Sequence, residues 1–165
     1  MASSGKLLTY RTIEGSSPNR FGILLHGFGA DAEDLLPLTE VLDPDRRLTW
    51  LVPEAPVSFQ DYGFPGGRAW FPASVQELSQ ALFGGYFSKL GALDPPGLHN
   101  GAVLLRNTFR GVASDGELSV LAGFSQGAMV ATDAVLTGVL QPAALLLFSG
   151  TVIAHERWRA AVPPV

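Results

Sequence analysis

The chain has 165 residues, of which 47% are hydrophobic and 16% are charged, a composition typical of one globular domain with a sizeable buried core. Its formal net charge of −4, with no cluster of Lys or Arg, argues against nucleic acid and anionic membranes as partners. The absence of cysteine excludes disulfides, thiolate zinc sites and a cysteine nucleophile.

The predicted elements alternate between strand and helix, which indicates a mainly parallel sheet with helices on both faces. We expect strands at Lys6–Ile13, Phe21–Leu25, Leu48–Val52, Leu118–Ala122 and Ala143–Phe148. We expect helices at Asp34–Leu42, Val75–Phe83, Leu98–Val112 and Ser125–Thr137, and another that begins at His155. The glycine- and proline-containing segment Gly15–Asn19 predicts a hairpin turn between the first two strands. Residues 1–165 are thus predicted to form a single α/β domain.

The N-terminal residues contain no apolar segment of the kind found in a secretory signal. No apolar run approaches the 18 residues that a membrane-spanning helix needs. We therefore expect a cytoplasmic protein without a membrane span.

Ser125 lies in the motif Gly-Phe-Ser-Gln-Gly, between the predicted strand Leu118–Ala122 and the predicted helix. A strand, a sharp turn that carries serine, and a helix are the elements of a nucleophile elbow. Gly123 and Gly127 have no side chains, so the backbones of strand and helix can approach each other closely. The alternative is a glycine-rich turn in which Ser125 only caps the helix.

A second loop of interest follows the strand Phe21–Leu25 and begins with His26-Gly27-Phe28. Acyl transfer needs hydrogen-bond donors aimed at the oxyanion of the tetrahedral intermediate, and backbone N–H groups supply them without reorganisation. In an α/β-hydrolase, one donor is the residue after the nucleophile, here Gln126, and the other comes from such a loop, here Phe28. An ordinary glycine loop between strand and helix is the alternative.

Three segments resemble the phospholipase/carboxylesterase family of small serine esterases, which includes the acyl-protein thioesterases and bacterial carboxylesterases. They are Leu24–Leu35, Gly67–Phe71 and Gly123–Ala128, and the similarity extends from about Phe21 to about Trp158. The resemblance implies a compact α/β-hydrolase that cleaves carboxylic esters or thioesters without a metal or a cofactor. It also implies that Ser125 is the nucleophile, that Phe28 and Gln126 are the oxyanion donors, and that Trp70 lies near the acyl site.

Aromatic residues are concentrated in the long stretch between Pro53 and Pro72, which shows no periodicity. Long loops in compact domains are often functional, and aromatic side chains suit an acyl chain. Packing over the sheet edge is the alternative for any one of them. We predict that Trp70 and Phe71 from this stretch bind substrate together with His26 and Gly27, where His26 also orients the oxyanion loop through hydrogen bonds.

Triad partners in this fold follow the nucleophile in the order Asp or Glu, then His. After Ser125, the only Asp is Asp133 and the only His is His155. Asp133 lies eight residues along the nucleophile helix, about 12 Å away, and is predicted to be a surface residue. His155 opens a helix and is expected to be solvated or to cap it, while His99 is expected at the surface. The acid and base of a triad are therefore not found in this chain.

The last predicted strand, Ala143–Phe148, is apolar throughout, a pattern expected when neighbouring strands lie on both sides and helices cover both faces. An edge strand without charge is unprotected. We therefore expect that the chain is truncated at its C-terminus, so that the last strands of the sheet are missing, or that this strand mediates self-association.

Three hypotheses follow. The first is a serine hydrolase, represented by an incomplete chain, that acts on a small-molecule ester or thioester. The second is a non-catalytic relative that binds acyl ligands. The third is an assembly in which a partner chain supplies the acid and the base.

Overall fold

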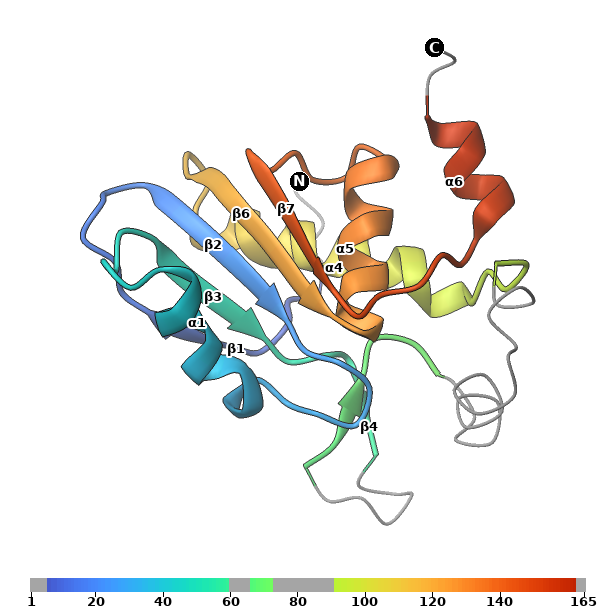
Figure 1. Cartoon of the computed structure of the whole chain (residues 1–165), viewed down its shortest axis with the longest axis horizontal. Coiled ribbons are helices and arrows are strands. Elements are labelled where there is room, and N and C mark those ends of the chain that lie inside the picture. Colours follow the sequence, from blue (N-terminus) through green and yellow to red (C-terminus); the bar gives the residue numbers. More distant parts are fainter. Residues whose placement is uncertain (1–5, 60–65, 73–90, 163–165) are drawn as a thin grey trace.

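A five-stranded sheet forms the centre of the computed structural model, which describes residues 6–59, 66–72 and 91–162 (Figure 1). Its strands lie in the order β1-β3-β2-β6-β7. β2, β3, β6 and β7 run parallel, and β1 is antiparallel to β3. The predicted mainly parallel sheet is confirmed. The strands are β1 (Tyr10–Ile13), β2 (Arg20–Leu25), β3 (Thr49–Pro53), β6 (Glu117–Phe124) and β7 (Ala144–Phe148).

Helices connect the parallel strands. A short 3₁₀ turn, η1 (Glu33–Leu35), leads into α1 (Leu36–Leu42) between β2 and β3, and α4 (Pro96–Val112) precedes β6. α5 (Gln126–Leu136) joins β6 to β7, and α6 (His155–Ala161) follows β7. A separate two-stranded ribbon, which the sequence did not predict, pairs β4 (Val57–Ser58) with β5 (Arg68–Ala69). The helix predicted at Val75–Phe83 lies outside the described residues.

The side chains of the central strands alternate between two apolar layers, as the period of a strand requires. Along β2, Ile23 and Leu25 belong to the larger core beneath α4 and α5, whereas Leu24 packs in the smaller core beneath α1. The helices thus cover both faces of the sheet (Figure 1), as predicted. The same alternation places Leu51 and Leu121 in the larger core and Trp50, Val52 and Ala122 in the smaller one.

The hairpin predicted between the first two strands is wrong. β1 pairs with β3, with Tyr10 opposite Pro53, and β3 lies between β1 and β2. β2 is apolar on both faces and lies at the centre of the sheet, so it needs a strand on each edge. β3 returns from α1 parallel to β2 and takes one of these edges. The predicted turn packs instead beside the segment before β3, where the N–H of Ser16 donates to the carbonyl of Arg46 over 2.8 Å.

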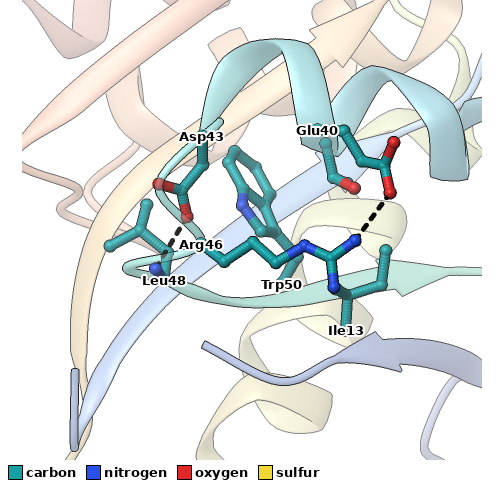
Figure 2. A pocket seen from close by; sticks show the side chains of 7 residues that line it. Ile13, Glu40, Asp43, Arg46, Leu48 and Trp50 are labelled. Carbon is teal, nitrogen blue, oxygen red and sulfur yellow. Dashed lines mark hydrogen bonds and ion pairs between the residues drawn. The ribbon is translucent and has the colours of Figure 1, made fainter. Parts of the chain in front are cut away.

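Asp43 shapes the turn between α1 and β3 (Figure 2). Its carboxylate accepts the backbone N–H groups of Arg47 and Leu48 over 3.0 and 2.7 Å. Burial alone would raise the pKa of Asp43, but these hydrogen bonds, together with the Trp50 side chain and the charge of Arg47, lower it below its usual value. The pocket beside this turn has a volume of about 10 Å³, the scale of a single water molecule, and does not fit a substrate.

β7 lies at the edge of the sheet and, among the described residues, pairs only with β6. Leu147 on this strand is 47% exposed. The apolar run that predicted covered faces and two neighbouring strands therefore forms a partly exposed edge strand in the described part of the chain. None of the helices that the structure describes is both long enough and apolar enough to span a membrane.

Candidate functional site

Ser125 occupies the sharp turn between β6 and α5, at the carboxyl end of the sheet. Its backbone has φ 52° and ψ −115°, a positive-φ conformation that is sparsely populated and costs a residue with a side chain about 1–3 kcal/mol. The backbone N–H of Ser125 holds the turn, because it donates to the carbonyl of Phe148 on β7 over 2.8 Å. The side chain is partly exposed. Strain at an accessible serine is the local geometry that a nucleophile elbow requires.

The two glycines of the motif are needed for close backbone approach. A Cβ on Gly123 would lie 2.5 Å from the carbonyl carbon of Gly127. One on Gly127 would lie 2.4 Å from the carbonyl oxygen of Leu25 at the end of β2. Since both neighbours are backbone atoms, a side chain at either position would force the strand and helix apart.

The loop after β2 runs directly beside Ser125. A Cβ on Gly27 would lie 3.3 Å from the Cβ of Ser125. The structure thus brings together the two segments that the sequence singled out. Phe28 follows in this loop, and its ring packs on Phe59 with 4.8 Å between ring centroids.

The backbone N–H groups at this junction that have no acceptor among the residues that the structure describes include those of Phe28 and Gln126. The next residue in the loop behaves differently, because the N–H of Gly29 donates to the carbonyl of Arg68 over 2.8 Å. Unpaired N–H groups near a partly exposed serine are available to a ligand oxygen.

His26 is fully buried under the loop. Its Nδ1 donates to the carbonyl of Gly27 over 2.8 Å, and its Nε2 accepts the N–H of Ala55 over 3.0 Å. Because one ring nitrogen donates and the other accepts, the imidazole is the neutral Nδ1–H tautomer. Burial lowers the pKa of His26, although the hydrogen bond to Gly27 acts in the opposite direction. The ring is therefore hydrogen-bonded to Gly27 within the loop and to Ala55 beside it, and its role in orienting the loop stays a prediction.

Trp70 and Phe71 pack behind the loop, and both side chains are buried. The indole Nε1 of Trp70 donates to the carbonyl of His26 over 2.8 Å. The side chain of Gln126, itself buried, accepts the N–H of Trp70 over 2.8 Å and donates to the carbonyl of Phe71 over 2.9 Å. The sequence pointed to Gln126 only for its backbone N–H. Its side-chain contacts could not be foreseen, because they join residues more than fifty positions apart.

The prediction that Asp133 is a surface residue is wrong, since its side chain is fully buried. Its carboxylate accepts from Trp158 Nε1 over 2.7 Å, contacts His99 Nδ1 over 2.9 Å and pairs with Arg157. Arg157 also binds Asp94 through two hydrogen bonds of 2.8 and 2.7 Å. A signal was present in the sequence: Asp133 is the only charged residue of α5, and a helix that is apolar all round is a buried one.

The charges of this cluster stabilise one another. Hydrogen bonding to Asp94 is the largest cause that raises the pKa of Arg157, and the same bond lowers the pKa of Asp94. His99 is about half exposed, and His155 is exposed at the start of α6, as predicted. Within the described residues 6–59, 66–72 and 91–162, the Ser125 hydroxyl makes no hydrogen bond. The three histidines of the chain, His26, His99 and His155, all lie in these ranges, so none of them is hydrogen-bonded to Ser125.

A second hollow lies at the opposite end of the sheet. It has a volume of about 560 Å³ and is lined by the beginning of β6, the C-terminal part of α4 and residues 138–143. Ser125 follows the other end of β6, so this hollow is separate from the serine. Among the described residues, no group of three or more His, Asp or Glu side chains is arranged to hold a metal ion.

A model of the phospholipase/carboxylesterase family matches residues 12–163. The chain belongs to this family. The structure of esterase PE8 is 25% identical, with a TM-score of 0.73, and the match covers 97% of this chain and 73% of that one. Comparison with curated protein sequences gives no match.

Two further structures of the same fold are the acyl-protein thioesterase 2 of Zea mays and the carboxylesterase of Bacillus cereus. The maize protein is 21% identical, with a TM-score of 0.64, over 93% of this chain and 66% of its own. The Bacillus protein is 20% identical, with a TM-score of 0.65, over 90% and 63%. The predicted α/β-hydrolase fold is confirmed, and the chain spans about two thirds of the length of these two structures.

Proposed function

We propose that this protein hydrolyses carboxylic esters or thioesters, with Ser125 as the nucleophile. The observation that carries the proposal is the strained backbone of Ser125, with φ 52° and ψ −115°, at the turn from β6 to α5. Such strain persists only where the surrounding structure imposes it, and it is concentrated at active sites. Membership of the phospholipase/carboxylesterase family supports the reaction class.

In this proposal, Ser125 Oγ attacks the carbonyl carbon of the substrate, and negative charge develops on the carbonyl oxygen. The N–H groups of Phe28 and Gln126 donate to this oxyanion. Removing one such donor typically costs about 10²–10³ in turnover. Solvent, or a base from outside the described residues, takes the hydroxyl proton of Ser125 and returns a proton to the leaving alcohol or thiol as its bond to the carbonyl carbon breaks. Water then adds to the acyl-serine with the same proton transfer, which releases the carboxylic acid and restores the Ser125 hydroxyl.

The substrate is a small-molecule ester or acyl compound, and we place its acyl group beside the loop after β2. Gly27 borders Ser125 and is proposed to contact the substrate directly through its backbone. His26, Trp70 and Phe71 are buried in the described structure, so their proposed part in substrate binding is to shape the wall of the site from behind.

Among the described residues, no general base is hydrogen-bonded to Ser125. His26 is committed to Gly27 and Ala55, while His99 bonds to Asp133. A serine without a base is a poor nucleophile, and removal of a triad leaves roughly 10³–10⁴-fold acceleration over water. We propose that this polypeptide alone is a slow hydrolase and that a base from outside the 165 residues would be needed for fast turnover. The Ser125 hydroxyl has no hydrogen-bond partner in the described part of the chain, which also favours a second candidate, an acyl-binding relative without catalysis.

The test is the intact mass of the folded chain after treatment with a fluorophosphonate probe, which reacts with activated serines. Ser149→Ala provides a matched control for Ser125→Ala, because Ser149 also has φ 52° and follows the neighbouring strand β7. Because no base contacts Ser125 in the described structure, we expect one adduct that forms slowly, over prolonged incubation, on the wild-type chain and on Ser149→Ala, and none on Ser125→Ala.

An adduct that persists in Ser125→Ala would contradict the assignment of the nucleophile. A folded wild-type chain that is never labelled would refute the hydrolase proposal for this polypeptide. Equilibrium binding of a medium-chain fatty acid by that unlabelled chain would then support the acyl-binding relative.

A further proposal concerns partners. The exposed edge of β7 carries no charged residue, and unpaired backbone groups on such an edge readily pair with another chain. We propose that the chain self-associates through β7.

A further inference from the structure

The two proposed oxyanion donors lie on segments that are far apart in the sequence. The N–H of Phe28 belongs to the loop after β2, and that of Gln126 begins α5. One oxygen atom can accept from both only if the loop and the helix hold a fixed distance. The following inference rests on the proposed function and concerns what sets that distance.

The side chain of Gln126 ties α5 to the segment after β5. It is 4% exposed, and both of its polar groups are used on the backbone. Oε1 accepts the N–H of Trp70 over 2.8 Å, and Nε2 donates to the carbonyl of Phe71 over 2.9 Å. These two bonds need one acceptor and one donor at the end of the same side chain, which the carboxamide provides.

The connection continues from Trp70 to the loop after β2. The Trp70 indole donates to the carbonyl of His26 over 2.8 Å, and the two rings are packed with 5.7 Å between centroids. Nδ1 of His26 then donates to the carbonyl of Gly27 over 2.8 Å. That carbonyl belongs to the peptide group whose nitrogen is the N–H of Phe28. The hydrogen-bonded path therefore starts at one proposed donor residue and ends at the peptide group of the other.

We propose that Gln126, Trp70 and His26 form an oxyanion brace, which sets the spacing of the N–H groups of Phe28 and Gln126. Within the brace, the side chain of Gln126 is a positioning residue, since its two hydrogen bonds go to Trp70 and Phe71 and not to Ser125. A misplacement of about 1 Å in an active site can cost about 10²-fold in rate. Loss of the Gln126 side-chain bonds is therefore expected to slow acylation of Ser125 without removing either N–H donor.

Two substitutions at Gln126 distinguish the contribution of its donor, which binds Phe71, from that of its acceptor, which binds Trp70. Gln126→Met keeps the length of the side chain and loses both bonds, so we expect labelling by the fluorophosphonate to be about 10²-fold slower. Gln126→Glu keeps the acceptor, and its buried carboxyl, when protonated, also provides a donor to Phe71. The labelling rate of Gln126→Glu relative to the wild type is therefore expected to rise as the pH falls, while the ratio for Gln126→Met stays constant.

Thr108→Val is the matched control for the loss of buried bonds. Thr108 is 2% exposed, and its hydroxyl likewise accepts a backbone N–H, from Leu8, and donates to a backbone carbonyl, that of Leu104. It lies in the C-terminal half of α4, so its loss tests general destabilisation. We expect Thr108→Val to be labelled at the wild-type rate.

If the wild-type chain is not labelled, the proposed function is refuted but the brace is not, and a second measurement then tests the brace. The ¹H–¹⁵N resonance of the Phe28 amide is expected to shift in Gln126→Met and to stay in place in Thr108→Val. An unshifted Phe28 resonance in Gln126→Met would overturn the brace. So would a Gln126→Met chain that is labelled as fast as a labelled wild type.

Discussion

Gly127 offers a direct test of the close approach between β2 and α5. In Gly127→Ala, the new Cβ would lie 2.4 Å from the carbonyl oxygen of Leu25 and 2.5 Å from that of His26. Carbon–oxygen contacts normally lie near 3.3–3.6 Å, so the helix or the strand must move by about 1 Å. Both carbonyls belong to buried backbone, which cannot rotate away as a flexible side chain could.

The expected cost follows from two opposing effects. Overpacking a well-packed interior costs about 1–3 kcal/mol. Replacing glycine by alanine in a helix returns about 0.5–1 kcal/mol through lower backbone entropy in the unfolded chain. We therefore expect Gly127→Ala to lower the free energy of unfolding by about 1–2 kcal/mol.

Gly101→Ala in α4 is the matched control, because its Cβ would meet Val130 at 3.6 Å, an ordinary contact. It is expected to leave the free energy of unfolding unchanged or to raise it by up to about 1 kcal/mol. Urea denaturation followed by tryptophan fluorescence measures both variants. If Gly127→Ala proves as stable as Gly101→Ala, the close approach of β2 and α5 is refuted.

Four further predictions concern single side chains. Ser125→Gly should raise the free energy of unfolding by about 1 kcal/mol in urea denaturation, because glycine relieves a strain of about 1–3 kcal/mol and loses about 0.5–1 kcal/mol to entropy. Asp133→Asn should lower the free energy of unfolding by about 1–3 kcal/mol. This is less than the cost of breaking a fully buried ion pair, because Arg157 keeps its second carboxylate partner, Asp94. Below about pH 6.5, the unfolded state binds a proton at His26 that the folded state, with its lowered pKa, does not. The free energy of unfolding should therefore fall by up to about 1.4 kcal/mol for each unit by which the pH is lowered. The same measurement on His26→Asn should lack this slope. Sedimentation velocity should show concentration-dependent association that Leu147→Lys abolishes and that Leu93→Lys, at a site of 50% exposure, does not.

The features that the sequence predicted are those set by the local backbone. Apolar strands followed by turns located β2, β6 and β7 within one or two residues of their observed bounds. The two glycines around Ser125 predicted the sharp turn, since only glycine permits the observed backbone distances. The pairing of β1 was missed for a physical reason: a turn between adjacent strands does not reveal whether a later strand inserts between them, as β3 does.

Polar side chains inside the core were much harder to predict than the turns. An aspartate in a helix usually faces water, because burial of a lone charge is costly. Asp133 is buried since Arg157 and Trp158, which follow β7, bring donors to it. Sequence periodicity indicates that α5 is apolar, but it does not indicate which side chains of a later helix, here Arg157 and Trp158 of α6, donate hydrogen bonds to α5.

Gln126 and Asp133 show how α5 connects the site to the rest of the fold. Gln126, in the first turn, binds backbone groups of the segment that packs behind the elbow. Asp133, two turns later, binds side chains of α4 and α6. Bonds from a neutral amide to the backbone do not change with pH or salt, whereas the bonds of a carboxylate do. The neutral set of contacts thus holds the first turn of α5, next to Ser125, and the charged set connects α5 to α4 and α6.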